Sequence, residues 1–417
     1  MKKIACIILA AGRGVRMKSS TPKVLHRICG RPMLSFVIDT ARALKIKKIT
    51  VVAGDKQAEV KKLLKGESGV KCVVQKRLLG TADALKVALR TLGGSSGTIL
   101  VLYGDIPLLK VKTLKGLLAG HAQNAADATI LVARAEKPFG YGRIMRDNYS
   151  TVKQIVEEKD ADDFQRDIKE INTGIICFDK RKLNQALKRV RRNKRNGEYY
   201  LTDCIGILHK KGALIESVRL RDRDEALGIN SRADLARANS IMQRRINDGF
   251  MAKGVSIIDP RSTFIDYDVR IGGDSVIYPF TVIESNVKIG KRCHIGPFAH
   301  LRQKSVIGDD VVAGNFVELV RTKLSSKVLM KHFSYLGDAR IEDGVNIGAG
   351  TVTANFDGKK KNLTRVKRDA FIGSDTVLVA PVEIGRGATT GAGSVVTKGK
   401  NVPDGKTVAG VPARPLK

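Results

Sequence analysis

The second half of the chain carries a six-residue repeat of aliphatic side chains, and few folds can accommodate such a pattern. The aliphatic positions recur without a break at Ile265, Ile271, Ile277, Ile283, Ile289, Ile295, Leu301 and Ile307. The repeat resumes at Ile341 and Ile347, and again at Ile372, Leu378 and Ile384. This period is typical of a parallel β-helix, in which each hexapeptide forms one short strand with its aliphatic side chain pointing inward.

The repeat fails in two places, around 324–330 and around 355–366, where basic and polar residues replace the aliphatic positions. A stack of coils accommodates extra residues as loops that leave the stack. Because loops carry function more often than the scaffold that holds them, we expect extruded loops with functional side chains near both breaks.

The chain before the repeat alternates short β-branched runs with longer helical patterns, which predicts a parallel sheet covered by helices. We expect strands at 4–10, 48–54 and 97–105, and helices at 33–44, 56–65 and 81–92. The predicted organisation is a Rossmann-like α/β domain at 1–232, a helical linker at 233–252 and a β-helix at 253–417.

The net charge of this 417-residue chain is +34, which makes polyanions attractive partners. The densest basic run, 188–195, has no interleaved aromatic side chains, so we interpret it as a solvated face and expect no nucleic-acid partner.

The six cysteines lack metal-ligand spacing, and no apolar stretch reaches the ~20 residues that a membrane span requires. We therefore expect a cytoplasmic protein that does not enter a membrane.

A glycine-rich turn follows the first predicted strand. Its glycines permit close backbone approach, and Arg13, Arg16 and Lys23 supply three cations, so the segment can hold a triphosphate. A tight turn with solvated arginines explains the same residues equally well.

Asp105 follows the apolar run at 99–103, at the carboxyl end of a predicted strand, and is a candidate Mg²⁺ ligand if phosphates bind opposite it.

Ordered motifs extend over the whole first domain: LAAGRGVRM, PKVLH, LGTADA, LYGDIPLL, GYGRI, IVEEKDA, EINTGI, GEYYLTD and GIN. Together they closely resemble the nucleotidyltransferase domain of the GlmU family of bifunctional N-acetylglucosamine-1-phosphate uridyltransferases and glucosamine-1-phosphate acetyltransferases. In the second domain, GNFVE, HFSYLGDA, VNIGAGT, NFDG and FIGSDT resemble the acetyltransferase domain of the same family. The resemblance implies an enzyme that supplies UDP-N-acetylglucosamine for cell-envelope polysaccharide, with acetyl transfer before uridyl transfer.

The resemblance assigns roles in the first domain position by position. It places Arg16 and Lys23 on the phosphates as catalytic cations. Other UTP contacts would be Leu9, Ala11, Gly12, Gln75, Gly80 and Thr81. Sugar contacts would be Tyr103, Gly142, Glu157, Asn172 and Asn230, while Mg²⁺ would be held by Asp105 and Asn230. The sugar 1-phosphate would then attack the α-phosphate of UTP, and pyrophosphate would leave in line.

In the second domain, the resemblance makes His332 the general base for acetyl transfer from acetyl-CoA to the amine of glucosamine 1-phosphate. Glu318 would orient His332. From spacing alone, a structural histidine is the simpler explanation of His332. Sugar-phosphate contacts would be Arg302, Tyr335, Asn346 and Lys361. Acetyl-CoA contacts would be Ala349, Asn355, Phe356, Ser374 and Ala392.

Three departures from the family pattern leave alternatives open. Val320 stands where the family has a phosphate-binding lysine, Phe356 replaces a tyrosine, and the VAGVPARPLK end resembles general hexapeptide acyltransferases. One alternative is a uridyltransferase with an altered or inactive acyltransferase domain. Another is a noncatalytic regulatory or assembly subunit, which the complete set of catalytic cations and metal ligands argues against. The family also implies a homotrimer with a left-handed β-helix and acetyl sites between neighbouring copies.

Overall fold

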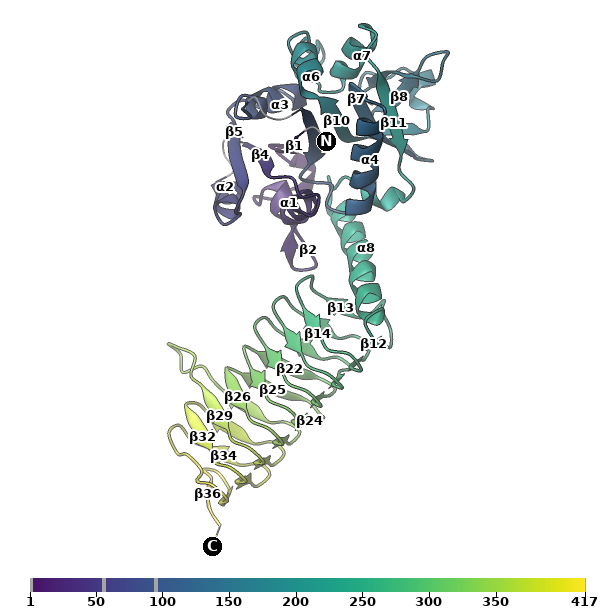
Figure 1. The fold of residues 1–417 in the computed structure, drawn as a ribbon. Helices are drawn as coiled ribbons and strands as arrows, with labels where there is room; N and C mark the ends of the chain where they lie inside the picture. Colours follow the sequence, from purple (N-terminus) through teal and green to yellow (C-terminus); the bar gives the residue numbers. More distant parts are fainter. Residues whose placement is uncertain (1–2, 55–57, 94–96, 417) are drawn as a thin grey trace. The chain divides into compact units, whose positions relative to one another are not determined.

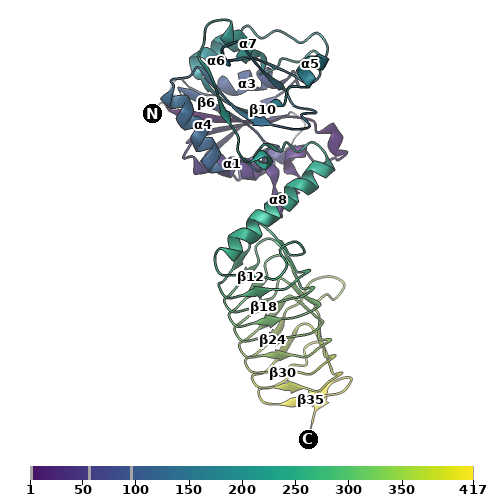
Figure 2. The ribbon, with the colours of Figure 1, turned by 90° about the vertical axis from the view of Figure 1, so that its right-hand side faces the viewer.

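The computed structural model describes residues 3–54, 58–93 and 97–416. The chain divides into two compact units, Met1–Ala238 and Asn239–Lys417, and helix α8 (Arg232–Met251) contains the division (Figures 1 and 2). The first unit is a layered α/β structure, and the second is a stack of short strands. None of the helices in the described part of the chain is long and apolar enough to cross a membrane.

A nine-stranded sheet forms the centre of the first unit, with the order β11-β7-β10-β6-β1-β4-β5 and with β8 and β9 attached through β10. Its strands are β1 (Ile4–Ala10), β4 (Lys48–Gly54), β5 (Val70–Gln75), β6 (Thr98–Tyr103), β7 (Ala128–Arg134), β8 (Arg143–Arg146), β9 (Val152–Val156), β10 (Glu170–Asp179) and β11 (Ile215–Arg219). A small separate sheet pairs β2 (Arg27–Ile28) with β3 (Arg31–Pro32).

The α-helices of this unit are α1 (Met33–Ala43), α2 (Ala58–Lys65), α3 (Thr81–Leu89), α4 (Val111–Gln123), α5 (Asp163–Arg166), α6 (Lys180–Leu187) and α7 (Asp203–His209). Short 3-10 helices are η1 (Val15–Met17), η2 (Lys23–Leu25) and η3 (Arg223–Ala226). The helices of this unit cover both faces of the sheet, because its central strands are apolar on both sides. On β1, Ile7 and Ile8 are both 0% exposed and belong to different hydrophobic clusters.

The predicted α/β class is confirmed in this unit. The strands expected at 4–10 and 48–54 coincide with β1 and β4. The strand expected at 97–105 is present as the shorter β6. Helices α1 and α3 form as expected and end a little earlier. Helix α2 begins at Ala58, while the first two positions of the predicted helix, 56 and 57, lie outside the described residues.

The register of the sheet brings the carboxyl ends of four parallel strands to one edge. Leu9 on β1 pairs with Tyr103 on β6, and Gly54 on β4 pairs with Gln75 on β5. Open α/β sheets bind their ligands at this edge. Segments that are far apart in the sequence therefore meet where a ligand is expected.

Three stacked sheets build the second unit, one for each side of a triangular coil, and we name each by its first strand. The β12 sheet contains β12 (Ser256–Ile257), β15 (Val276–Ile277), β18 (His294–Ile295), β21 (Val312–Ala313), β24 (Leu329–Met330), β27 (Asn346–Ile347), β30 (Phe371–Ile372), β33 (Thr389–Thr390), β35 (Thr407–Ala409) and β36 (Arg414–Pro415). The β13 sheet contains β13 (Phe264–Ile265), β16 (Val282–Ile283), β19 (His300–Leu301), β22 (Val317–Val320), β25 (Ser334–Gly337), β28 (Val352–Ala354), β31 (Val377–Val379) and β34 (Val395–Val396). The β14 sheet contains β14 (Arg270–Ile271), β17 (Lys288–Ile289), β20 (Val306–Ile307), β23 (Lys323–Leu324), β26 (Ala339–Ile341), β29 (Thr364–Val366) and β32 (Val382–Ile384).

The aliphatic positions of the repeat form one hydrophobic core along this stack. Ile277 and Ile295 are in register on neighbouring strands, and both are 0% exposed. Each coil is covered by the next, so the inward side chains contact their equivalents above and below. The predicted parallel β-helix is confirmed.

The prediction of an extruded loop at 324–330 is wrong. Leu324 and Met330 are core residues, 1% and 0% exposed, on β23 and β24. Ile289 pairs with Ile307, eighteen positions further on, whereas Ile307 pairs with Leu324, only seventeen further on. The coil lacks one residue, so the repeat changes phase without leaving the stack.

The second break is a true loop, which leaves the stack between β28 and β29 (Figure 1). Phe356 and Lys361 form an isolated antiparallel bridge within it, and Asn362 donates its backbone N–H to the carbonyl oxygen of Asn355 at 2.7 Å. The loop therefore closes on itself as a short hairpin. It carries three residues that the sequence assigned to substrates, Asn355, Phe356 and Lys361.

We predict that Ile283→Ala lowers the free energy of unfolding by about 2–5 kcal/mol, because Ile283 is 1% exposed and its truncation leaves a cavity in the core. Val282→Ala is the matched control, since Val282 lies next to it but is 37% exposed, and a change within about 0.5 kcal/mol is expected. Denaturant unfolding of both variants measures the difference. Equal effects would contradict the assignment of inward and outward positions.

Candidate functional site

A cavity of 590 Å³ lies at the carboxyl edge of the sheet in the first unit. The turn after β1, the helix η2, the start of α3 and the ends of β5 and β6 build its walls. Its lining includes nine residues that the sequence assigned to nucleotide, sugar or metal: Leu9, Ala11, Gly12, Lys23, Gln75, Gly80, Thr81, Tyr103 and Asp105. Sequence reasoning missed Glu198, which lines the same cavity.

Gly80, at the start of α3, can only be glycine. Its φ is +101°, and a Cβ atom there would lie 2.5 Å from the carbonyl oxygen of Tyr199. Gln75, which is 3% exposed, donates from Nε2 to the carbonyl oxygen of Gly80 at 3.1 Å and to Asp83 Oδ2 at 2.8 Å. This side of the cavity is therefore held in place before any ligand arrives.

The turn after β1 carries the predicted phosphate contacts. Gly14, with φ of +64°, precedes η1. Arg13 lines the cavity, whereas the exposed Arg16 on η1 does not belong to its lining. Of the two arginines in this turn, only Arg13 therefore belongs to the cavity lining. The sequence pattern could not tell which of them faces the cavity.

Lys23 joins this turn to two other segments. Its ammonium group forms an ion pair with Asp105, and its Nζ donates to Asn230 Oδ1 at 3.1 Å. The side chains of Lys23 and Asp105 are only 12% and 16% exposed, so this contact is largely shielded from water. The two predicted metal ligands are therefore adjacent, with a cation held between their oxygens.

The oxygens of Asp105 and Asn230 fit Mg²⁺, because they are hard ligands that already converge on one positive charge. No group of three or more His, Cys, Asp or Glu side chains that could hold a metal occurs among the described residues. Mg²⁺ commonly takes one or two protein ligands and completes its coordination with phosphates and water. A site of this composition needs the phosphates of a substrate to be complete.

Tyr103 lies near both the predicted metal ligand Asp105 and the predicted sugar contact Glu157. Burial raises the pKa of its phenol, and the neighbouring carboxylates of Glu157 and Asp105 raise it further, while a hydrogen bond with Thr81 lowers it. The phenol therefore remains protonated at neutral pH. It is available to a ligand as a neutral hydrogen-bonding group.

Three predicted sugar contacts lie together near Tyr103. Asn172 donates its backbone N–H to the carbonyl oxygen of Gly142 at 2.8 Å, and a Cβ at Gly142 would lie 3.6 Å from Glu157 Oε2. Burial raises the pKa of Glu157, whereas the Thr202 hydroxyl, which donates to Oε1 at 2.8 Å, lowers it. Thr202 was missed by the sequence reasoning, although it belongs to the quoted GEYYLTD motif.

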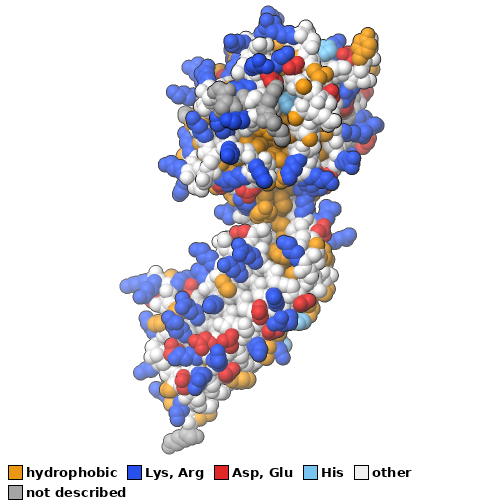
Figure 3. Space-filling model, in the orientation of Figure 1, with side chains coloured by type: hydrophobic (Ala, Val, Ile, Leu, Met, Phe, Trp, Pro, Cys, Tyr) orange, Lys and Arg blue, Asp and Glu red, His pale blue; other side chains and the backbone are white. Residues whose placement is uncertain are grey.

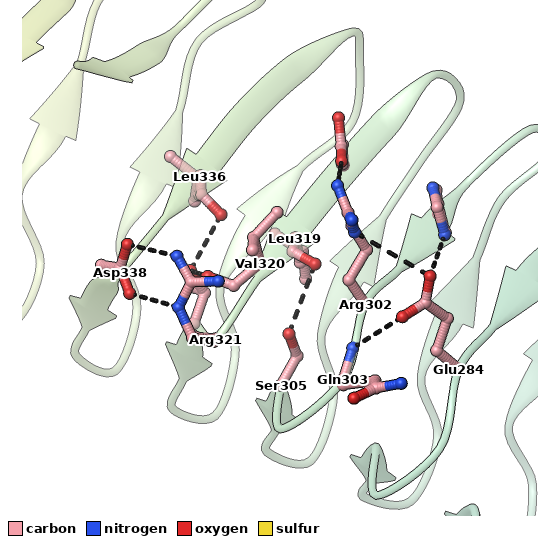
Figure 4. Close-up of polar contacts among 12 residues, drawn as sticks. Glu284, Arg302, Gln303, Ser305, Leu319, Val320, Arg321, Leu336 and Asp338 are labelled. Atoms are coloured by element: carbon pink, nitrogen blue, oxygen red, sulfur yellow. Dashed lines mark hydrogen bonds and ion pairs between the residues drawn. The ribbon is translucent and has the colours of Figure 1, made fainter. Parts of the chain in front are cut away.

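In the second unit, His332 lies exposed at the turn between β24 and β25. Glu318 accepts a hydrogen bond from Arg302 Nη1 at 3.2 Å, and within the described residues no hydrogen bond joins it to His332. Arg302 also lies 3.9 Å from Glu284, which contacts His300 Nε2 at 2.9 Å (Figure 4). Two carboxylates thus hold the predicted phosphate contact Arg302.

His332 and three predicted acetyl-CoA contacts lie at the same corner of four consecutive coils. The backbone N–H groups that connect these turns are those of Gly350 to Phe333 at 2.7 Å, Asp375 to Ala349 at 2.6 Å and Gly393 to Ser374 at 2.8 Å. His332, Ala349, Ser374 and Ala392 therefore form one row along the stack. The candidate base and the candidate cofactor contacts are brought together by coil geometry alone.

The other predicted contacts are divided between two faces. Tyr335 lies on β25 in the β13 sheet, whereas Asn346 lies on β27 in the β12 sheet. Lys361 Nζ stands 4.3 Å from the centre of the Phe356 ring, so the phenylalanine supports the lysine through a cation–π contact. One chain alone therefore does not place all the predicted sugar contacts on one surface.

Val320 ends β22 and is 7% exposed, in register with Gly337. The adjacent Arg321 donates from Nε and Nη2 to the two oxygens of Asp338, both at 2.6 Å (Figure 4). This guanidinium holds the pKa of Asp338 below its usual range. Asn355 donates to the same carboxylate at 2.5 Å, so Arg321 belongs to a charged network beside Val320.

Models of known families match both units. The MobA-like NTP transferase domain matches residues 6–175. The bacterial transferase hexapeptide, a model of six repeats, matches residues 268–303, and the hexapeptide repeat of succinyl-transferase matches residues 364–398. These matches agree with the α/β unit followed by the β-helix.

Curated relatives match almost the whole chain. The Bifunctional protein GlmU of Geobacillus sp. (strain WCH70) is 43% identical over 95% of this chain and 93% of its own length. Its counterpart in Halalkalibacterium halodurans is 42% identical over 94% and 93%, and that in Pelotomaculum thermopropionicum is 45% identical over 91% and 90%. Both units and their order are shared, and the chain belongs to the GlmU family of bifunctional proteins.

Proposed function

We propose that this chain makes UDP-N-acetylglucosamine for the cell wall in two steps. The second unit acetylates glucosamine 1-phosphate with acetyl-CoA, and the first unit transfers UMP from UTP to the product. Membership of the GlmU family carries this proposal, because the bifunctional relatives match both units. Nothing in the comparisons favours a uridyltransferase with an idle second domain or a noncatalytic subunit.

In uridyl transfer, the residues of the first unit bind and align the reactants. Arg13, Arg16 and Lys23, with backbone N–H groups of the turn after β1, would hold the triphosphate. Asp105 and Asn230 would hold Mg²⁺, which supplies charge neutralisation at the phosphates when bound. The 1-phosphate oxygen attacks the α-phosphorus, the bond to the bridging oxygen breaks, and pyrophosphate leaves. Alignment and charge neutralisation supply the catalysis.

In acetyl transfer, His332 would accept a proton from the 2-amino group of glucosamine 1-phosphate. The nitrogen attacks the thioester carbon, the carbon–sulfur bond breaks, and the proton passes from His332 to the departing sulfur of coenzyme A. A histidine suits this task because its unperturbed pKa lies near neutral pH. The row that contains His332, Ala349, Ser374 and Ala392 supports this assignment.

A homotrimer belongs to the same proposal. Phe280, Phe298 and Phe316 stack at 4.9 Å between ring centres, and each ring is about half exposed. An exposed apolar ladder of this kind is typical of an interface. The ladder occupies the turn positions that precede the His332 turn along the stack, so a neighbouring copy seated there would complete the acetyl site.

We predict that Arg16→Ala and His332→Ala have opposite effects on the two activities. Arg16→Ala should lower uridyl transfer roughly 10²-fold or more and leave acetyl transfer unchanged, because it removes charge from the phosphates only. His332→Ala should abolish acetyl transfer and spare uridyl transfer. Pyrophosphate and free-thiol release, measured separately, report the two steps, with Arg90→Ala as an exposed control. Near-normal uridyl transfer in Arg16→Ala would contradict the phosphate assignment.

We predict that Thr202→Val shifts the pH dependence of uridyl transfer. The raised pKa of Glu157 means that its carboxylate gains a proton at a higher pH than an exposed glutamate does. Removing the Thr202 hydroxyl, which favours the charged form, raises this pKa further. The acidic limb of kcat/KM for N-acetylglucosamine 1-phosphate should therefore move to higher pH, while KM for UTP stays constant.

Thr202→Ser is the control for this variant, because serine retains the hydroxyl group that donates to Glu157. It should restore the wild-type pH profile. If the acidic limb of Thr202→Val stays in place, Glu157 does not act on the sugar as a carboxylate.

A further inference from the structure

The outward positions of the β14 sheet differ chemically from those of the other two sheets. Along the β14 sheet they are Arg270, Lys288, Val306, Lys323, Arg340, Arg365 and Glu383. The matching positions of the β13 sheet are Phe264, Val282, His300, Glu318, Tyr335, Val352, Val377 and Val395. Those of the β12 sheet, from Ser256 to Thr407, also contain no lysine or arginine. Among the outward positions of the parallel strands, lysine and arginine are thus confined to the β14 sheet, while the antiparallel strand β36 adds the exposed Arg414 at the end of the β12 sheet.

Three of these cations occupy consecutive coils, and we call Lys323, Arg340 and Arg365 the cation column. Lys323 pairs in register with Arg340, and Arg340 pairs with Arg365. Their inward neighbours Leu324 and Ile341 are core residues, each 1% exposed, so the backbone fixes the column to the outer face. Neighbouring strands lie about 4.8 Å apart, and like charges directly opposite each other repel.

The column lies in a hollow of 690 Å³ that contains more cations than carboxylates. Its other charged residues are Lys304, Arg321, Lys367, Asp338, Glu342 and Glu383. Arg321 already binds Asp338, and Lys367 Nζ lies 2.7 Å from Glu383 Oε1. Glu342 accepts the backbone N–H of Arg368 at 3.0 Å.

The acidic side chains of the hollow are therefore engaged elsewhere. In the part of the chain that the structure describes, no carboxylate forms an ion pair with a member of the cation column. On the visible side of the second unit, where β26 and β29 also lie, Lys and Arg side chains are interleaved with Asp and Glu side chains (Figures 1 and 3). Glu383 is in register with Arg365 but forms its ion pair with Lys367, so the column is an array of like charges that an external anion can approach.

We propose that the cation column binds a linear chain of phosphates, laid along the stack across successive coils. A polyphosphate chain matches the column because its anionic groups follow one another closely and in line. Guanidinium groups bind phosphate oxygens in pairs, which suits Arg340 and Arg365. The hollow contains no aromatic side chain on which a base could stack, so an inorganic chain is favoured over single-stranded nucleic acid.

Titration calorimetry of the full-length protein with long-chain inorganic polyphosphate, at several salt concentrations, tests this proposal. The triple variant Lys323→Gln/Arg340→Gln/Arg365→Gln should weaken binding by about tenfold or more. It should also reduce the slope of log K against log salt by about 2, since each phosphate contact contributes about 0.7. Acetyl and uridyl transfer should be unchanged, because none of the three residues belongs to either candidate site.

The matched control is Lys291→Gln/Lys400→Gln/Lys406→Gln, which removes the same charge from exposed positions outside the hollow. It should retain wild-type affinity. Equal loss in both triple variants would overturn the proposal, because net charge alone would then explain binding. Binding of single-stranded RNA without binding of polyphosphate would also overturn it, and so would the absence of any binding by the wild-type protein.

Discussion

Parallel pairing between strands is the constraint on which both units depend. It aligns equivalent positions of segments that are far apart in the sequence, so side chains at strand ends meet at one edge or one corner. In the first unit, pairing of Leu9 with Tyr103 sets the phosphate turn beside the segment that carries Asp105. In the second unit, the same principle stacks His332, Ala349, Ser374 and Ala392 at one corner of successive coils.

The local pattern of the sequence was sufficient for the fold class because both kinds of strand have strong signals. The apolar run at β1 and the regular spacing from Ile265 to Ile307 each predict burial without tertiary information. The interval around Leu324 was misread, because one missing residue changes the phase of the repeat in the same way that an inserted loop does. Only the position of the following coil distinguishes the two cases.

The candidate site was less accessible to sequence reasoning than the fold. Family motifs located Glu157, yet the hydroxyl of Thr202 that adjusts its pKa is 45 positions away and follows from tertiary packing alone. The contact of Lys23 with Asp105 likewise joins segments 82 positions apart. Arg13 and Arg16 are three positions apart in the motif, and only Arg13 lines the cavity, a difference that backbone geometry decides.

Two of the three departures from the family pattern, Val320 and Phe356, lie close to one charged network in the second unit. Val320 is buried, and Arg321 beside it is engaged by Asp338, which in turn contacts Asn355 on the extruded loop. If the predicted phosphate site needs a cation at position 320, Val320 does not supply it, while the charged network next to it holds the start of the loop that carries predicted acetyl-CoA contacts.

The most direct test of the account is one assay with purified protein, glucosamine 1-phosphate, acetyl-CoA, UTP and Mg²⁺, in which free thiol and pyrophosphate are followed separately. Preacetylated N-acetylglucosamine 1-phosphate serves as the control substrate. The account predicts release of both products from glucosamine 1-phosphate, with thiol release preceding pyrophosphate release. Pyrophosphate from the preacetylated sugar alone, or no release in either channel, would contradict it.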